Sequence, residues 1–200
     1  MTTGFCFDLD GTITSTEILP CIASDIGLAE EIATLTRITM DGLITFDESL
    51  RLRVALLGQI PLSKIHKIVN EVILTPSIEN FIRTHTANCF IITGNLDIWT
   101  KQITEKLGCR GFYSTACITN ERVYLKSVLL KEMAVKKIRA LGFSKIIAIG
   151  DGANDTSMLR AADIGIAYGG IHSPAACLID EADYIVHEGE SLCKLLNALS

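Results

Sequence analysis

The chain has 200 residues, of which 48% are hydrophobic, and its formal net charge is −5. This length suffices for one full core with a modest insertion and excludes two large domains. The acidic balance argues against a nucleic-acid partner, which requires a clustered basic face, and leaves small anionic substrates as candidates. No apolar run reaches the roughly 18 residues of a membrane-spanning helix, and the first ten residues lack the pattern of an export signal. We therefore expect a soluble, cytoplasmic protein.

Five short apolar runs predict buried strands, the last of them the weakest: residues 5–9, 89–92, 145–149, 164–167 and 184–186. Helical stretches follow most of these runs. This alternation indicates right-handed crossovers and a mostly parallel sheet with helices on both faces. We predict an α/β fold, a three-layer Rossmann-like parallel sheet whose ligands bind at the carboxyl ends of the strands.

The long segment at residues 14–74, between the first two predicted strands, is predicted to be entirely helical. Thr45 and Glu48 have the spacing of a capping box, which predicts a helix over residues 46–57. We expect this segment to form a small all-helical cap over the crevice. The catalytic core would then consist of residues 1–13 and 75–200.

Two carboxylates, Asp8 and Asp10, interrupt the first apolar strand at its end. A buried strand does not tolerate such charges without compensation from a metal or a function. The two-residue period of a strand points both side chains to one side. Paired carboxylates suit Mg²⁺, and a carboxylate can also attack phosphorus. We predict Asp8 as nucleophile and Asp10 as the acid that protonates the leaving group and then activates water.

Phosphate-holding groups are predicted at the end of the second strand and on a later helix. Thr93 and Gly94 precede a predicted helix at residues 96–107, whose first N–H groups would bind an anion. Phosphoryl transfer also needs a cation near the phosphate oxygens. Lys131 is our choice for this cation, with three alternatives in Lys126, Lys136 and Lys137.

The segment Gly150-Asp151-Gly152-Ala153-Asn154-Asp155 follows a third apolar strand. Asp151 is predicted to complete the Mg²⁺ shell that Asp8 and the Asp10 carbonyl begin. We also predict Asn154 as a substrate ligand, and Asp155 and Thr12 as supports of the metal ligands. In contrast, the four histidines are scattered at no zinc-ligand spacing, so we expect surface or satisfied side chains for His66, His85, His172 and His187.

In order and approximate spacing, these motifs resemble the haloacid dehalogenase-like phosphatases over nearly the whole chain. Within that family the chain is most similar to the phosphoserine phosphatases, because its helical insertion carries Glu17 and the run at residues 46–54. The resemblance implies that Glu17 binds the ammonium group of phosphoserine and that Arg53 binds its carboxylate. Arg53 lies at the edge of the apolar stripe of its predicted helix, so it can reach into the crevice.

The predicted function is thus a Mg²⁺-dependent phosphomonoesterase that hydrolyses phosphoserine through an aspartyl phosphate. Two departures from the family pattern leave the substrate open. The chain has Thr93-Gly94-Asn95 where the family has Ser-Gly-Gly, and residues 111–126 look shorter than the corresponding stretch of the family. Phosphohomoserine, a sugar phosphate or a nucleotide remain alternatives, as does transfer to a second alcohol. A phospho-accepting receiver domain is the alternative from another class, although it has no use for Asp10 or for a lid.

Overall fold

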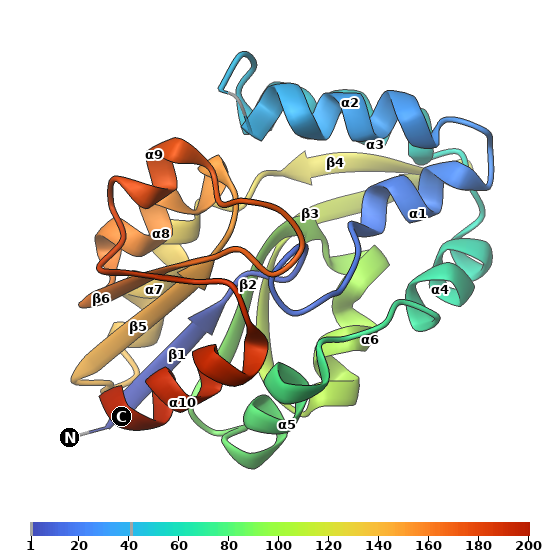
Figure 1. Ribbon diagram of the computed structural model, residues 1–200. Coiled ribbons are helices and arrows are strands. Elements are labelled where there is room, and N and C mark those ends of the chain that lie inside the picture. Colours follow the sequence, from blue (N-terminus) through green and yellow to red (C-terminus); the bar gives the residue numbers. More distant parts are fainter. Residues whose placement is uncertain (1, 41) are drawn as a thin grey trace.

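The computed structural model describes residues 2–40 and 42–200, and within them it forms a sheet in the order β4-β3-β2-β1-β5-β6-β7 (Figure 1). All neighbouring strands are parallel except the β3–β4 pair. The strands are β1 (Thr3–Phe7), β2 (Cys89–Leu96), β3 (Arg110–Thr119), β4 (Arg122–Ser127), β5 (Lys145–Gly150), β6 (Ile164–Tyr168) and β7 (Tyr184–Val186).

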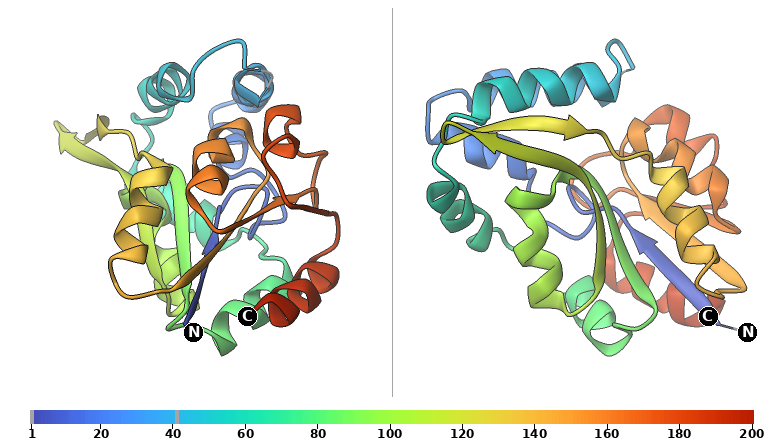
Figure 2. Two further views of the ribbon diagram at one scale, coloured as in Figure 1. Left: turned by 90° about the vertical axis from the view of Figure 1, so that its left-hand side faces the viewer. Right: turned by 180° about the vertical axis from the view of Figure 1, so that it is seen from behind.

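Helices cover both faces of this sheet, which makes the core three layers thick (Figure 2). One face packs against α5 (Pro76–Thr84), α6 (Asp97–Leu107) and α10 (Gly189–Leu199). The other face packs against α7 (Lys131–Arg139), α8 (Thr156–Ala161) and α9 (Ala176–Ile179), and a short 3₁₀ helix at Ala153–Asp155 precedes α8. The predicted α/β class is confirmed.

Side chains alternate along the central strand between the two layers. Phe5 and Phe7 belong to the apolar cluster on the side of α5, whereas Cys6 belongs to the cluster around α7. All three are buried. Because both faces of a parallel sheet are covered, its strands appear in the sequence as continuous apolar runs, which is why they could be predicted.

Of the five helices that the described residues form between β1 and β2, four lie over the carboxyl ends of the strands (Figure 1): α1 (Ile18–Ser24), α2 (Ala29–Met40), α3 (Phe46–Leu57) and α4 (Leu62–Asn70). The helix predicted over residues 46–57 is confirmed, together with its capping box. The Thr45 hydroxyl accepts from the Glu48 N–H at 3.3 Å, and the Thr45 N–H donates to Glu48 Oε2 at 3.0 Å. An isolated bridge between Thr14 and Leu74 joins the two chain segments at which this helical region begins and ends.

Residues 111–126, in which the sequence analysis predicted no strand, contribute most of a β-hairpin made of β3 and β4. Asn120 and Glu121 form its turn with φ values of 50° and 63°, the left-handed region that tight hairpin turns require. The hairpin contacts the end of α3, where the Val123 N–H donates to the Gly58 carbonyl at 2.8 Å. Most of its side chains are at least partly exposed, so it lacks the apolar run that marked the other strands.

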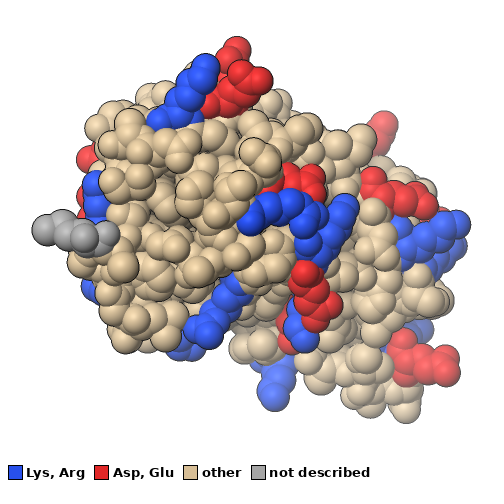
Figure 3. Space-filling view, turned by 90° about the horizontal axis from the view of Figure 1, so that it is seen from below, with Lys and Arg blue, Asp and Glu red and all other residues tan. Residues whose placement is uncertain are grey.

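The surface carries mixed charges. On the face seen from below, lysines and arginines lie next to acidic side chains, and no continuous basic area covers it (Figure 3). Within the described part of the chain, the helices are all too short or too polar to cross a bilayer.

Candidate active site

A buried ionic cluster lies at the carboxyl ends of β1 and β5. Lys131, the first residue of α7, places Nζ 2.6 Å from Asp8 Oδ1 and 2.5 Å from Asp155 Oδ1. All three side chains are buried. The other three candidate lysines, Lys126, Lys136 and Lys137, are exposed. The structure therefore brings only Lys131, of these four residues, to the nucleophile candidate.

Asp155 organises the loop that follows β5. Its Oδ2 accepts from the backbone N–H groups of Asp151 at 3.1 Å and Gly152 at 3.0 Å. A Cβ at Gly150 would collide with the Asp155 side chain, which explains the glycine at that position. The Thr12 hydroxyl donates to Asp151 Oδ1 at 3.0 Å, so Thr12 and Asp155 together fix how Asp151 faces the site.

The cluster holds more negative than positive charge, because Lys131 is the cation within it while Asp8, Asp151 and Asp155 have carboxylate oxygens within 4.8 Å of one another. Burial, and then the charge of Asp155, raises the pKa of Asp8 well above its ordinary value, against the opposing effect of Lys131. Burial also raises the pKa of Asp151 to about 6. Acids that resist ionisation at such close range fit a divalent cation, which would offset their repulsion.

Asp10 is held by donors on both carboxylate oxygens. Oδ1 accepts from the Ile18 N–H at 2.9 Å, and Oδ2 accepts from Asn95 Nδ2 at 3.3 Å. Burial and then the charge of Glu17 raise the pKa of Asp10 to about 7. A carboxyl group that titrates near neutrality can give a proton and take one back, which is what the predicted acid and base requires.

Thr93 and Gly94 lie inside β2 instead of at its end, because the strand continues to Leu96 and the helix begins at Asp97. Asp97 Oδ1 accepts from the Ile98 N–H at 2.8 Å, so the helix's own first-turn acid engages one of the N–H groups that were predicted to bind an anion. The Thr93 hydroxyl accepts from the Asn95 N–H at 3.0 Å and keeps its own hydrogen for another acceptor.

A small cavity of about 60 Å³ joins these core residues to the helical region above them. Its lower wall includes Asp8, Asp10 and Asp151, and its upper wall includes Glu17 and Arg53. A Cβ at Gly94 would collide with the ring of Phe46, so the core and α3 meet tightly at the edge of this cavity. The other lining residues are Leu19, Thr36, Thr39, Met40, Leu50, Thr93, Asn95, Gly152 and Asn154.

Arg53 is 6% exposed, and its hydrogen bonds are incomplete. Nη2 donates to the Thr39 hydroxyl at 3.4 Å, while Nε is buried without a partner. Burial lowers the pKa of Arg53, and the charges of Glu17 and Asp10 oppose this effect. Because an uncompensated buried guanidinium is costly, its position in the cavity wall indicates an anionic ligand.

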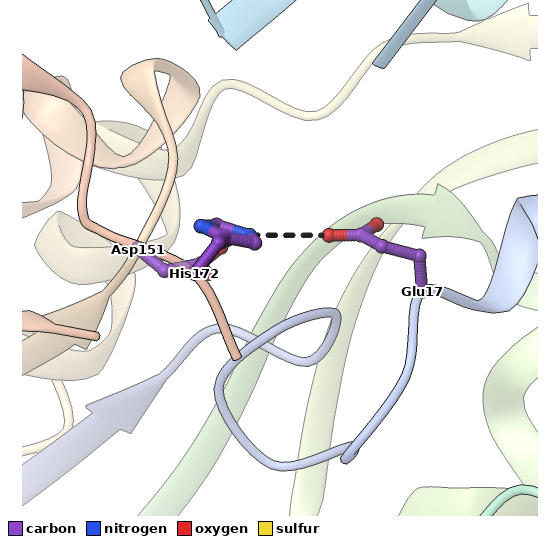
Figure 4. Close-up of side chains that lie close together, drawn as sticks. All are labelled: Glu17, Asp151 and His172. Carbon is purple, nitrogen blue, oxygen red and sulfur yellow. Dashed lines mark ion pairs between the residues drawn. The ribbon is translucent and has the colours of Figure 1, made fainter. Parts of the chain in front are cut away.

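His172 is a site residue that the sequence interpretation missed. It lies in the loop after β6, and Nε2 is 3.1 Å from Asp151 Oδ2 and 3.5 Å from Glu17 Oε1 (Figure 4). Nε2 makes no well-directed hydrogen bond to either group. The carboxylates of Asp151 and then Glu17 raise the pKa of His172 to about 10. Its expected role as a surface or satisfied side chain is therefore wrong, and no motif spacing marks this loop.

The family model of the haloacid dehalogenase-like hydrolases matches residues 2–163. The chain belongs to this family. The resemblance that the motifs indicated is confirmed. Because the chain belongs to a hydrolase family, we set aside the alternative of a receiver domain.

Among relatives, the chain is 31% identical over 175 residues to a phosphoserine phosphatase of Methanocaldococcus jannaschii, covering 81% of this chain and 83% of that one. It is 32% identical over 176 residues to a phosphoserine phosphatase of Streptomyces coelicolor, covering 80% of this chain and 42% of that longer one. A solved structure described as a phospho-aspartyl intermediate analogue of phosphoserine phosphatase superposes with a TM-score of 0.85 at 28% identity, covering 98% of both chains.

Proposed function

We propose that this chain is a Mg²⁺-dependent phosphatase that hydrolyses O-phosphoserine through an aspartyl phosphate on Asp8. The observation that carries this proposal is the shared cavity: the nucleophile candidate Asp8 lines its lower wall, and Arg53 and Glu17 line its upper wall. A phosphate group at Asp8 would leave an amino-acid leaving group facing one cation and one anion, which match its carboxylate and ammonium. The similarity to phosphoserine phosphatases of two other organisms supports the same substrate.

In the first step, an Asp8 carboxylate oxygen forms a bond to phosphorus while the bond from phosphorus to the serine oxygen breaks. Asp10 gives its proton to the departing oxygen, which leaves as the serine hydroxyl. Lys131 and the Thr93 hydroxyl donate to phosphate oxygens and so offset their negative charge. The two donors on Asp10, Ile18 and Asn95, hold its carboxyl group in place between transfers.

In the second step, Asp10 takes a proton from a water molecule as the water oxygen forms a bond to phosphorus. The bond between phosphorus and Asp8 breaks, which releases inorganic phosphate and restores the Asp8 carboxylate. Both steps use the same Asp10 carboxyl group in opposite directions. A pKa near 7 allows that group to hold the proton in one step and to lack it in the next.

We propose Asp8, the Asp10 carbonyl and Asp151 as the groups that hold Mg²⁺, with Thr12 and Asp155 orienting Asp151. The ion, when bound, supplies positive charge to the phosphate oxygens and to the crowded carboxylates. We further propose that residues 14–74 act as a cap that excludes water from the cavity, and that Asn154 and Gly94 complete its substrate-facing wall.

Phosphate release from a panel of esters tests this proposal. Phosphoserine, phosphothreonine, phosphohomoserine and a sugar phosphate would be compared in the presence of Mg²⁺ and in the presence of EDTA. We expect kcat/KM to be highest for phosphoserine and release to cease in EDTA. Preference for an ester without the amino-acid group would overturn the proposed substrate and keep the catalytic scheme, whereas full activity in EDTA would overturn the metal dependence.

A further inference from the structure

Glu17 and Arg53 carry opposite charges on the wall of one small cavity. Their charges are close enough for Glu17 to influence the pKa of Arg53. Both residues lie in the described part of the chain, and yet no ion pair joins them there, since the guanidinium contacts Thr39 and leaves Nε unpartnered. Opposite charges in a partly desolvated space attract strongly. The structure thus keeps these two charges unpaired on one cavity wall.

His172 supplies the competing contact. Its Nε2 lies 3.5 Å from Glu17 Oε1, and its Nδ1 lies 3.1 Å from the Ser173 carbonyl, so both ring nitrogens face oxygen acceptors. Among residues 2–40 and 42–200, Glu17 forms an ion pair with His172 and with no other residue. Glu17 directly precedes α1 without capping that helix through its side chain, so its own helix does not hold the carboxylate.

Glu17 lies between Arg53 and His172, which line two different cavities. A second, larger cavity of about 750 Å³ lies between α2 and the loop from His172 to Cys177. Glu17, Thr36 and Met40 line both cavities, whereas Arg53 lines only the small one and His172 only the large one. Glu17 thus stands on the wall between the two cavities, and its partners face it from opposite cavities.

We infer that His172 is a positioning residue for substrate specificity, which holds the Glu17 carboxylate away from Arg53 and so keeps the ammonium and carboxylate subsites open. This inference rests on the proposed phosphoserine activity, because only a leaving group with both charges needs both subsites. Without His172, Glu17 would pair with Arg53 and occupy the space that the amino-acid group requires. A substrate with neither charge would not depend on this separation.

Kinetics of His172→Ala with two esters test the inference. Phosphoserine carries both charges, and p-nitrophenyl phosphate carries neither. We expect KM for phosphoserine to rise about tenfold or more, which corresponds to about 1.4 kcal/mol of lost binding, with a smaller change in kcat. For p-nitrophenyl phosphate, kcat/KM should fall several-fold less than for phosphoserine, because only phosphoserine needs the two separated charges. His172→Gln, which keeps a donor toward Glu17, should recover part of the loss.

The contact between His172 and Asp151 provides the competing explanation. If His172 served mainly to support the metal site, His172→Ala would lower kcat/KM for both esters alike and weaken Mg²⁺ binding in calorimetry. Either that result or unchanged kinetics on phosphoserine would overturn the inference. In a double-mutant cycle, Glu17→Gln should abolish the effect of His172→Ala on KM, because both changes act through one carboxylate. Additive effects would contradict this coupling.

A crystal structure of substrate-free His172→Ala separates this inference from the proposed function. We expect the Glu17 carboxylate to form an ion pair with Arg53 in that variant, whereas an unmoved Glu17 would overturn the inference. This result does not depend on which ester the enzyme prefers. A wild-type enzyme that ignores phosphoserine would overturn the proposed substrate alone, and the position of Glu17 would still decide the role of His172.

Discussion

The two ends of the small cavity are held in very different ways. At the end that we propose for the phosphate, Asp8 lines the cavity, and Lys131 Nζ lies 2.6 Å from Asp8 Oδ1 and 2.5 Å from Asp155 Oδ1. At the leaving-group end, the contacts of Arg53 and Glu17 are as long as 3.4 and 3.5 Å, and Arg53 Nε has no partner. The proposed phosphate end is thus preorganised without substrate, while the proposed leaving-group end has unsatisfied groups that a ligand would complete.

The largest effect should come from the nucleophile itself. Asp8→Asn removes the carboxylate that attacks phosphorus, so kcat should fall on the order of 10⁴-fold or more for every ester. Rapid assays with phosphoserine and p-nitrophenyl phosphate would measure this loss, with circular dichroism to verify folding. Retained turnover in a folded Asp8→Asn protein would refute the scheme, because no other group is assigned to the attack.

Lys131→Met tests the proposed phosphate end of the cavity through both activity and stability. Removing the buried ammonium leaves Asp8 and Asp155 without their cation, and we expect about 3–5 kcal/mol of lost stability and a fall in kcat of about 10²-fold or more. Urea unfolding and phosphate release would measure these changes. Lys137→Met, an exposed position on the same helix, is the matched control and should change neither quantity. Similar behaviour of the two variants would contradict the assigned role.

Asp10 should make the metal-free protein less stable as the pH rises. Its pKa is about 7 in the folded protein, against an ordinary value of 3.8. Between these values the folded state keeps a proton that the unfolded state has lost, so raising the pH from about 4 to 7 lowers the free energy of unfolding. The free energy of unfolding falls by at most about 1.4 kcal/mol per pH unit through this one group.

Asp10→Asn removes this dependence, so its stability relative to wild type should improve as the pH rises from 5 to 7 and then level off. Urea unfolding in EDTA at several pH values would measure the difference. Asp47→Asn, which changes a half-exposed acid on α3 that lies outside the cavity, is the control and should show no such trend. A difference between Asp10→Asn and wild type that is independent of pH would show that the folded pKa of Asp10 is ordinary.

The smallest effect concerns the start of α3, the helix that carries Arg53. Thr45→Ala removes the side-chain half of the capping box and should cost about 1 kcal/mol in the free energy of unfolding. Activity on p-nitrophenyl phosphate should be almost unchanged, because Thr45 does not line the cavity. Thr45→Ser keeps the acceptor and should retain wild-type stability in the same urea experiment. Equal stabilities of the Ala and Ser variants would argue against a stabilising capping box at Thr45.

The sequence could predict those features of the core that leave a local pattern in the chain. Strands covered on both faces leave continuous apolar runs, and acids at their ends stand out, so Asp8, Asp10 and Asp151 could be found from local patterns. The capping box likewise located α3 to the residue. The hairpin of β3 and β4 was missed because it is largely exposed and therefore carries no apolar run.

Contacts that depend on how distant segments meet could not be predicted. His172 approaches Glu17 and Asp151 only because the loop after β6 turns toward the helical region. The hydrogen bond from Asn95 to Asp10 spans 85 residues of sequence.

The most direct test of the account compares Arg53→Ala with Arg51→Ala on two substrates. Arg51 lies on the same helix, but its side chain is 61% exposed and pairs with Asp47. We predict that Arg53→Ala lowers kcat/KM for phosphoserine about 10²-fold, the loss of roughly two charge-assisted hydrogen bonds, and leaves p-nitrophenyl phosphate nearly unaffected. Arg51→Ala should change neither. An equal loss on both substrates, or no loss on phosphoserine, would contradict the claim that the two ends of the cavity have separate roles.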